Sequence, residues 1–224
     1  MKKFILASLV LVSTFSFAQV DLSSTRYGVT IGGNYSRVRN AHNPSGPIYG
    51  FQAGGLALIP VDKNNQFYIQ PEVVFYGAGE TGKDKDAKGT PGYDAIYSNS
   101  YVSVPVYFKG YFSEAESEFF AMAGPRFNFL IDQKVTDPSK PYYTEEGLDI
   151  PGTGNVNGKA SSFNFALGFG LGYSYKRQLE LALKYDMGLS DIYKGLRNEP
   201  GTDPNISKKK TEHVVSIGLA YIFE

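Results

Sequence analysis

The sequence has no cysteine and no tryptophan, only two histidines, and no long apolar run beyond its first residues. Without cysteine, disulfides, thiol nucleophiles and thiolate metal ligands are excluded. No later stretch approaches the roughly 18 consecutive apolar residues that a transmembrane helix requires. Because 22 basic residues face 22 acidic ones, there is also no excess positive charge for binding nucleic acid.

The first residues have the pattern of a secretory signal peptide. Two lysines precede an apolar run over 4–12, and Ser16 and Ala18 supply the small residues of a cleavage site. A membrane anchor is the alternative, but polar residues interrupt the run and leave it short for a span. We therefore predict a signal peptide over 1–18 and one mature domain over 19–224, with 20 basic and 22 acidic residues and a net charge of −2.

What the sequence does contain is tyrosine, phenylalanine and glycine, at 17, 16 and 25 residues. Eight segments alternate with a period of two, as strands with two different faces do. In 179–189, for example, large apolar side chains at odd positions alternate with Glu180, Lys184 and Asp186. The eight predicted strands are 26–38, 48–60, 66–77, 99–112, 118–131, 161–175, 178–190 and 211–223.

The connections between these strands alternate in length. Long connections over 39–47, 78–98, 132–160 and 191–210 are separated by three short turns. Long loops at one end and short turns at the other are typical of outer-membrane barrels, whose turns are periplasmic and whose loops are extracellular. We predict an all-β fold: an eight-stranded antiparallel up-and-down transmembrane β-barrel in a Gram-negative outer membrane, with both termini in the periplasm.

The cost of burying charge in lipid orients the faces. Lysine on the lipid face at mid-membrane costs about 2–4 kcal/mol, so the charged face must line the lumen. A soluble lipocalin-like barrel is the alternative, but it would have an apolar cavity and a polar outside. We call the odd or even position of a residue along its strand its parity, because residues of one parity share a face. When this alternation is extended to every strand, thirteen polar residues point inward: Thr30, Asn34, Gln52, Gln70, Glu72, Ser103, Lys109, Arg126, Asn128, Asn164, Glu180, Lys184 and Asp186.

The predicted lumen charges balance, with Glu72, Glu180 and Asp186 against Lys109, Arg126 and Lys184. An eight-stranded barrel is just wide enough for side chains to fill it. We therefore predict a structural polar network without an open pore, and a selectivity or proton pathway is the alternative. Adjacent strands further predict that Glu72 and Lys109 are neighbours.

One predicted strand does not alternate cleanly. In 118–131, Phe120 and Met122 share the parity of Arg126. This segment therefore contains either a bulge or a locally apolar stretch of lumen.

Candidate catalytic and metal-binding residues are few. His42 lies in a long connection, and His213 and Ser216 have opposite parity, which argues against a catalytic dyad. Asp84 and Asp86 have the spacing of a calcium loop, which here lacks its distal glutamate. We expect no catalytic residue, cofactor or metal site. The run 207–210, SKKK, is a solvated charge run or a contact to lipopolysaccharide phosphates.

Several stretches together resemble the outer membrane protein β-barrel domain of Bacteroidetes, the PorT-like group of small barrels. They include YGVTIGGNYS, YVSVPVYFKGYF, FFAMAGPRFNFLI, LALKYDMGLSDI and the terminal VSIGLAYIF. The resemblance implies a monomeric eight-stranded barrel without catalytic residues, and the named member is an accessory of type IX secretion and gliding. Ser103 departs from the glutamate usual there, and Glu224 follows Phe223 where such barrels commonly end on the aromatic residue.

The leading functional hypothesis is a non-enzymatic barrel with a structural, surface-binding or accessory role. An accessory of the type IX machinery and a lipid-modifying outer-membrane enzyme are the alternatives. Expected partners are outer-membrane lipid and lipopolysaccharide, a secretion or surface partner at the long loops, and the barrel-insertion machinery. By the same resemblance, Tyr221 and Phe223 form the assembly signal that this machinery reads.

Overall fold

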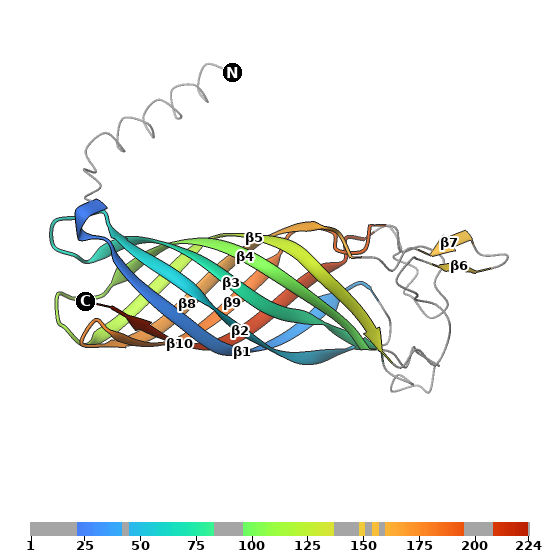
Figure 1. Ribbon diagram of the computed structural model, residues 1–224, viewed down its shortest axis with the longest axis horizontal. Helices are drawn as coiled ribbons and strands as arrows, with labels where there is room; N and C mark the ends of the chain where they lie inside the picture. Colours follow the sequence, from blue (N-terminus) through green and yellow to red (C-terminus); the bar gives the residue numbers. More distant parts are fainter. Residues whose placement is uncertain are drawn as a thin grey trace, which may run out of the picture.

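The computed structural model describes residues 22–41, 45–82, 96–136, 148–150, 154–156, 160–194 and 208–223. Within them, eight long strands form a closed barrel (Figure 1). The predicted signal peptide over 1–18 lies outside the described residues. Among the described residues, no helix is long and apolar enough to cross a membrane.

Each barrel strand pairs antiparallel with the next in the chain, and the last returns to the first. The strands are β1 (Arg26–Arg39), β2 (Ser45–Pro60), β3 (Phe67–Gly82), β4 (Ile96–Tyr111), β5 (Glu118–Thr136), β8 (Phe163–Tyr175), β9 (Leu179–Gly188) and β10 (Thr211–Ile222). All eight predicted strands are present, with ends within five residues of the predicted ones. The eight-stranded up-and-down barrel predicted from alternation is confirmed.

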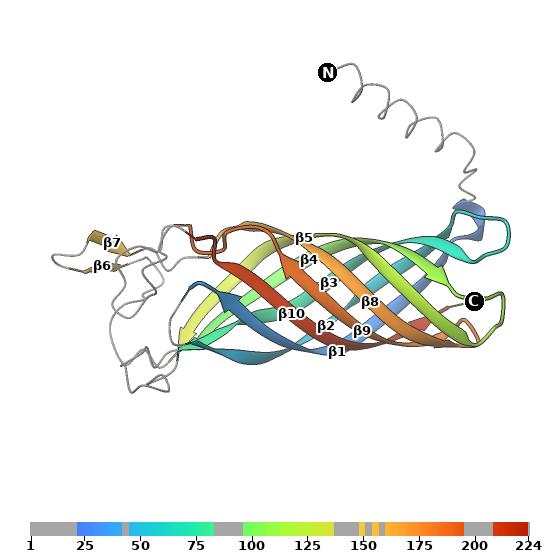
Figure 2. The same ribbon diagram turned by 180° about the vertical axis from the view of Figure 1, so that it is seen from behind.

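The predicted sorting of the connections also holds. The three short turns, 61–66, 112–117 and 176–178, meet at one end of the barrel, which we call the short-turn end. Helix η1 (Leu22–Ser24) and the end of β10 lie there too (Figures 1 and 2). The opposite end, the loop end, carries the long connections. One of these contains a small hairpin, β6 (Leu148–Ile150) with β7 (Gly154–Val156), which the sequence did not predict.

Side chains along the barrel strands alternate between a largely polar inner face and a largely apolar outer face. On β9, Leu183 is 59 % exposed on the outside, whereas the next residue, Lys184, is 7 % exposed and points into the lumen. All thirteen polar residues predicted to line the lumen are buried. The apolar face is therefore the outer face of the barrel.

Glycines on the inner face of β8 make room for large side chains from neighbouring strands. A Cβ on Gly168 would meet Asp186 Oδ1 at 2.7 Å, and one on Gly170 would meet Met122 Cγ at 2.9 Å. The alternation of glycine with large apolar residues in this strand thus has a packing reason. It lets a narrow barrel hold a dense charged interior.

The irregular alternation in β5 reflects apolar filling of the lumen. Phe120 and Met122 are both buried inside, where they pack in a cluster with Leu58, Tyr111 and other residues. β5 pairs with β8 residue for residue through this region, so no bulge lies there. A register shift does occur further along β5, where Ser100 and Tyr101 pair with Asp132 and Leu130 and Ile131 is the extra residue.

Candidate functional site

The lumen is the most chemically distinctive part of the barrel. Its centre is a set of three ion pairs, and each of them uses a residue of β9: Glu180, Lys184 or Asp186. Their partners come from β4, β3 and β5, none of which pairs with β9 in the sheet. Every pair therefore joins strands that are not neighbours in the sheet, and the Lys184–Glu72 pair joins β9 to β3 on the opposite wall.

The pair nearest the short-turn end joins Lys109 to Glu180. Lys109 is fully buried, and its Nζ donates to Glu180 Oε2. The other carboxylate oxygen accepts a hydrogen bond from the Tyr111 hydroxyl at 2.5 Å. Lys109 Nζ also lies 4.1 Å from the centre of the Phe120 ring, in a cation–π contact. Both charges are thus compensated by neighbouring side chains of the protein.

The central pair joins Lys184 to Glu72. Lys184 Nζ lies 2.8 Å from one oxygen of Glu72 and 3.1 Å from the other. Gln70 adds a third hydrogen bond to the same carboxylate at 2.7 Å. The Tyr107 ring lies under the ammonium group at 5.0 Å. The carboxylate of Glu72 and the ammonium group of Lys184 are therefore each stabilised by more than one polar or aromatic partner.

The third pair, Arg126 with Asp186, begins a chain of polar side chains. Arg126 Nη1 donates to Asp186, and its Nε donates to Ser103 Oγ at 2.7 Å. Ser103 in turn donates to Asn128, which donates to Asn164, each at 2.7 Å. Ser103 therefore links the arginine to two asparagines.

The predicted contact between Glu72 and Lys109 is wrong. In the register of β3 with β4, Lys109 lies opposite Tyr68, four residues from Glu72. Both charges instead find partners on β9, across the lumen. Parity assigned the residues to the correct face, but the height of each one depends on how the strands are staggered.

Arg177 closes the lumen at the short-turn end. It donates to backbone oxygens of all the other short turns: Asn65 at 2.9 Å, and Ala115 and Ser113 at 3.1 Å each. Its Nη2 also pairs with Glu118, and its guanidinium stacks 3.8 Å from the centre of the Tyr111 ring. A single side chain thus holds the three turns together.

Arg177 sits in a tight two-residue turn. Lys176 and Arg177 have φ values of 53° and 55°, and Gln178 N donates to Tyr175 O at 3.1 Å. This is a type I′ turn, which matches strand twist but normally uses glycine or asparagine. The hydrogen bonds of Arg177 offset the left-handed backbone at this position.

The loop end is closed by apolar residues that follow β9. Ile192 and Tyr193 are fully buried there, against Val38 and Tyr97. Backbone bonds from Ser161 N to Ile192 O at 2.7 Å and from Ile192 N to Lys210 O at 2.8 Å hold this segment in the mouth. No periodic pattern in the sequence predicts this closure, because the segment is not a strand.

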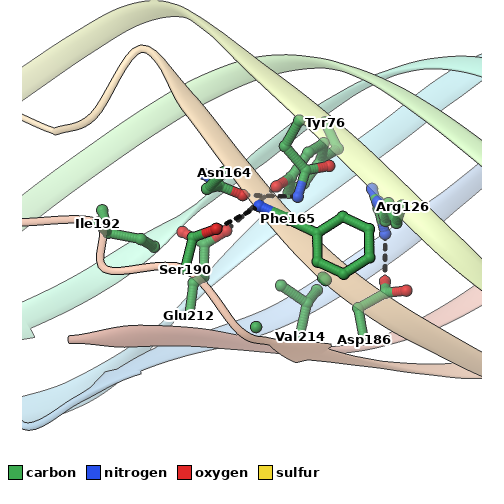
Figure 3. Close-up of a pocket in the computed structure, with 12 residues that line it drawn as sticks. Tyr76, Arg126, Asn164, Phe165, Asp186, Ser190, Ile192, Glu212 and Val214 are labelled. Atoms are coloured by element: carbon green, nitrogen blue, oxygen red, sulfur yellow. Dashed lines mark hydrogen bonds and ion pairs between the residues drawn. The ribbon is translucent and has the colours of Figure 1, made fainter. Parts of the chain in front are cut away.

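A small cavity of ≈ 10 Å³ lies just below this closure (Figure 3). Three buried atoms of its lining have no hydrogen-bond partner among the described residues: Asp186 Oδ1, Glu212 Oε2 and Asn164 Nδ2. Two acceptors and one donor suit one water molecule, and the cavity has about that capacity. A second internal cavity, beside Glu72 and Lys184, has the same volume of ≈ 10 Å³.

Two buried carboxylates at this end, Glu80 and Glu212, were not among the predicted lumen residues. Glu212 accepts a hydrogen bond from the Tyr76 hydroxyl at 3.1 Å and has no ion pair within the described chain. Both residues have the inward parity of their strands. Glu80 would have been found if alternation had been followed to the end of β3 at residue 82. Glu212 lies within the predicted strand 211–223, and alternation alone already places it inward.

The candidate dyad is separated by the wall of the barrel. Ser216 is buried in the lumen, whereas His213 lies on the outer side of β10. Both imidazole nitrogens of His213 have partners, the Tyr185 hydroxyl at 2.7 Å and Thr211 Oγ1 at 3.1 Å. His42, Asp84 and Asp86 lie outside the described residues. Within the described ranges, no group of three or more acidic, histidine or cysteine side chains could hold a metal ion.

The two aromatic residues at the end of β10 lie on the outer face. Tyr221 and Phe223 are about half exposed, and their rings meet edge to face at 5.7 Å. Phe223 N donates to Tyr27 O at 2.7 Å, so Phe223 is fixed to β1. Their role as an assembly signal stays a prediction.

The strand topology and the polar lumen agree with a sequence comparison. The model of the family described as outer membrane protein beta-barrel domain matches residues 17–194. The chain belongs to this family. As an outer membrane β-barrel, it crosses the outer membrane with the eight strands and turns its apolar face to lipid. Among curated proteins, none matches the chain.

Solved structures similar to this outer membrane barrel are also small barrels. Ail, the attachment invasion locus protein of Yersinia pestis, is 11 % identical with a TM-score of 0.42, over 88 % of this chain and 98 % of Ail. Neisserial surface protein A is 15 % identical with a TM-score of 0.40, over 88 % and 97 % of the two chains. The family assignment itself comes from the family model and the closed topology.

Proposed function

We propose that the protein is a non-enzymatic outer-membrane barrel that anchors its long loops at the cell surface, where they bind a partner or the surface itself. The observation that carries this proposal is the lumen, in which three ion pairs join strands that are not neighbours in the sheet. Such an interior supports a rigid anchor and does not favour a pore. Membership of the PorT-like group and a role in type IX secretion stay predictions.

The proposal includes an orientation, with the short-turn end and both termini in the periplasm. It is supported by the usual arrangement of bacterial barrels, in which short turns are periplasmic and longer loops are extracellular. The test uses single cysteines in this cysteine-free chain. With a membrane-impermeant maleimide on intact cells, Lys208→Cys at the loop end should be labelled, and Asn64→Cys only after the outer membrane is opened. Labelling of Asn64→Cys alone in intact cells would reverse the orientation.

The absence of a pore is tested separately. Purified protein in planar bilayers should show no large, steady conductance, because side chains fill the lumen. Reproducible steps of porin size from a homogeneous sample would contradict the anchor function.

The proposed partnership with the barrel-insertion machinery gives the first mutational prediction. Phe223→Ala should lower the amount of heat-modifiable barrel in the outer membrane several-fold, because the machinery reads a near-terminal aromatic residue. Deletion of Glu224 is the control and should leave assembly unchanged. Equal assembly of Phe223→Ala and the parent would remove Phe223 from the signal.

A further inference from the structure

The outer face of the barrel has a hollow near the short-turn end, with a volume of ≈ 870 Å³. Its floor is formed by small residues of β4 and β5: Gly110, Ala121 and Ala123. Large apolar residues form its two walls, Phe67, Phe108 and Phe112 on one side and Phe169, Leu171 and Leu183 on the other. We call this hollow the wall groove.

The strand register explains the depth of the wall groove. Ala121 lies between Gly110 on β4 and Leu171 on β8, and Ala123 lies between Phe108 and Phe169. Ala123 is thus flanked by large residues on both neighbouring strands, and Ala121 together with Gly110 widens the slot beside Leu171. The resulting slot runs up the barrel from the 112–117 turn.

One wall of the groove is held in place without a ligand. A Cβ on Gly110 would meet the Phe67 ring at 3.0 Å, so this ring covers the glycine. The same ring stacks on Phe108, with centroids 5.7 Å apart and planes at 15°. Because the wall is already ordered, a ligand loses little affinity to the ordering of side chains.

We propose that the wall groove binds one acyl chain of a phospholipid from the periplasmic leaflet. The groove is continuous with the lipid-facing band, and most of its lining is apolar, which suits a hydrocarbon chain. Lys184, which also borders it, directs its ammonium group into the lumen toward Glu72. It opens beside a short turn, so the choice of leaflet rests on the orientation proposed above.

A second copy of the barrel fits the groove poorly. A twofold interface places the same patch of both subunits face to face, so the hollow would oppose itself. Interfaces and cores require close packing, and two opposed hollows would leave a void. A single flexible chain can fill the slot along its length.

Fluorescence quenching tests the proposal, because the chain has no tryptophan of its own. Leu183→Trp puts one indole on the groove wall, and Ile31→Trp puts one on the lipid face of β1, outside the groove. The two heights are similar, since Leu183 pairs with Ile217 and Ile31 pairs with the nearby Leu219. As brominated phospholipid is added to vesicles, quenching at 183 should saturate at a small mole fraction, while quenching at 31 should rise in proportion.

Comparison of the two tryptophan variants tests lipid binding in the groove separately from the assignment of the outer face to lipid. Both indoles should be quenched in pure brominated phospholipid if both faces contact lipid. If both were quenched but followed the same curve, the groove would hold no preferred chain and the inference would fail alone. If neither were quenched, the lipid-facing assignment would fail with it.

Native mass spectrometry in mild detergent gives an independent readout. The parent should retain one phospholipid, and Ala123→Phe, which fills the floor, should retain at least ten-fold less. Ala53→Phe is the matched control, because Ala53 also lies on the outer face between two large residues, Ile31 and Phe75. Equal retention in all three proteins, or retention of a second copy or another protein in place of lipid, would overturn the proposal. If Ala123→Phe did not fold, the quenching comparison would decide.

Discussion

The two ends of the lumen are closed by different chemistry. At the short-turn end, Arg177 binds the backbone of the other turns and pairs with Glu118, and Lys109 pairs with Glu180 just above it. At the loop end, apolar Ile192 and Tyr193 cover a cavity beside Glu212, which has a tyrosine partner and no ion pair in the described chain. At the short-turn end, the charged groups named here form two ion pairs. At the loop end, Glu212 has no ion pair among the described residues.

This difference shows what each end requires. The short turns have few residues, so one long cationic side chain can reach all of them and fix the barrel. At the loop end, buried charge remains beside a space for water, and an excess carboxylate there adds less to stability than a paired one. Substitutions should therefore have unequal effects at the two ends.

The largest effect is expected where a charge of the short-turn half loses its partner. Lys109→Met leaves Glu180 buried and unpaired, which should lower the free energy of unfolding by about 3–5 kcal/mol. Urea titration in lipid vesicles measures this. The double variant Lys109→Met with Glu180→Met should lose less than the sum of the single losses, because the two side chains touch. Strict additivity would show that the pair contributes no coupling.

A smaller effect is expected at the turn that closes this end. Arg177→Ala removes three hydrogen bonds to backbone oxygens and the ion pair with Glu118, and should cost about 2–4 kcal/mol given a net 0.5–1.5 kcal/mol for each hydrogen bond. Lys176→Ala is the matched control, since it changes the neighbouring residue of the same turn, whose side chain is exposed. If both variants unfolded at the same urea concentration, Arg177 would not be what holds the turns together.

The loop end should tolerate the loss of a carboxylate. Glu212→Gln keeps an oxygen for the Tyr76 hydroxyl and removes a charge without an ion pair, so its effect should stay within about 1 kcal/mol. The same exchange at Glu180 removes the counter-ion of Lys109 and should cost clearly more. Equal losses of stability in Glu212→Gln and Glu180→Gln would contradict the proposed difference between the two ends of the lumen.

The smallest effect is a gain in stability. Lys176 has φ of 53° and an exposed side chain, so Lys176→Gly should relieve a left-handed backbone cost of roughly 1–2 kcal/mol. Glycine also makes the unfolded chain more flexible at a cost of roughly 0.5–1 kcal/mol, so the expected net gain is below about 1 kcal/mol. Unfolding in urea again provides the measurement. A loss of stability would indicate that the Lys176 side chain, whose Nζ lies 5.5 Å from the centre of the Tyr175 ring, contributes more than the strain costs.

Much of the fold could be predicted because strand alternation is local. Successive side chains of an extended chain point to opposite faces, so Leu183 and Lys184 had to lie in different surroundings once either face was assigned. The lipid cost of charge then placed Glu180, Lys184 and Asp186 inside. For the same local reason, the short turns were visible as breaks between alternating segments.

The partners in the ion pairs could not be predicted from strand alternation. Lys109 and Glu180 belong to strands that do not pair in the sheet, and their contact depends on barrel closure and on the stagger of every strand between them. Closure by Arg177 and by Ile192 with Tyr193 likewise joins residues far apart in sequence and outside the alternating pattern. The sequence by itself determined the faces and the strand order, because both follow from backbone geometry and solvation. Only the tertiary structure decided the partners, because they are set by distances across the lumen.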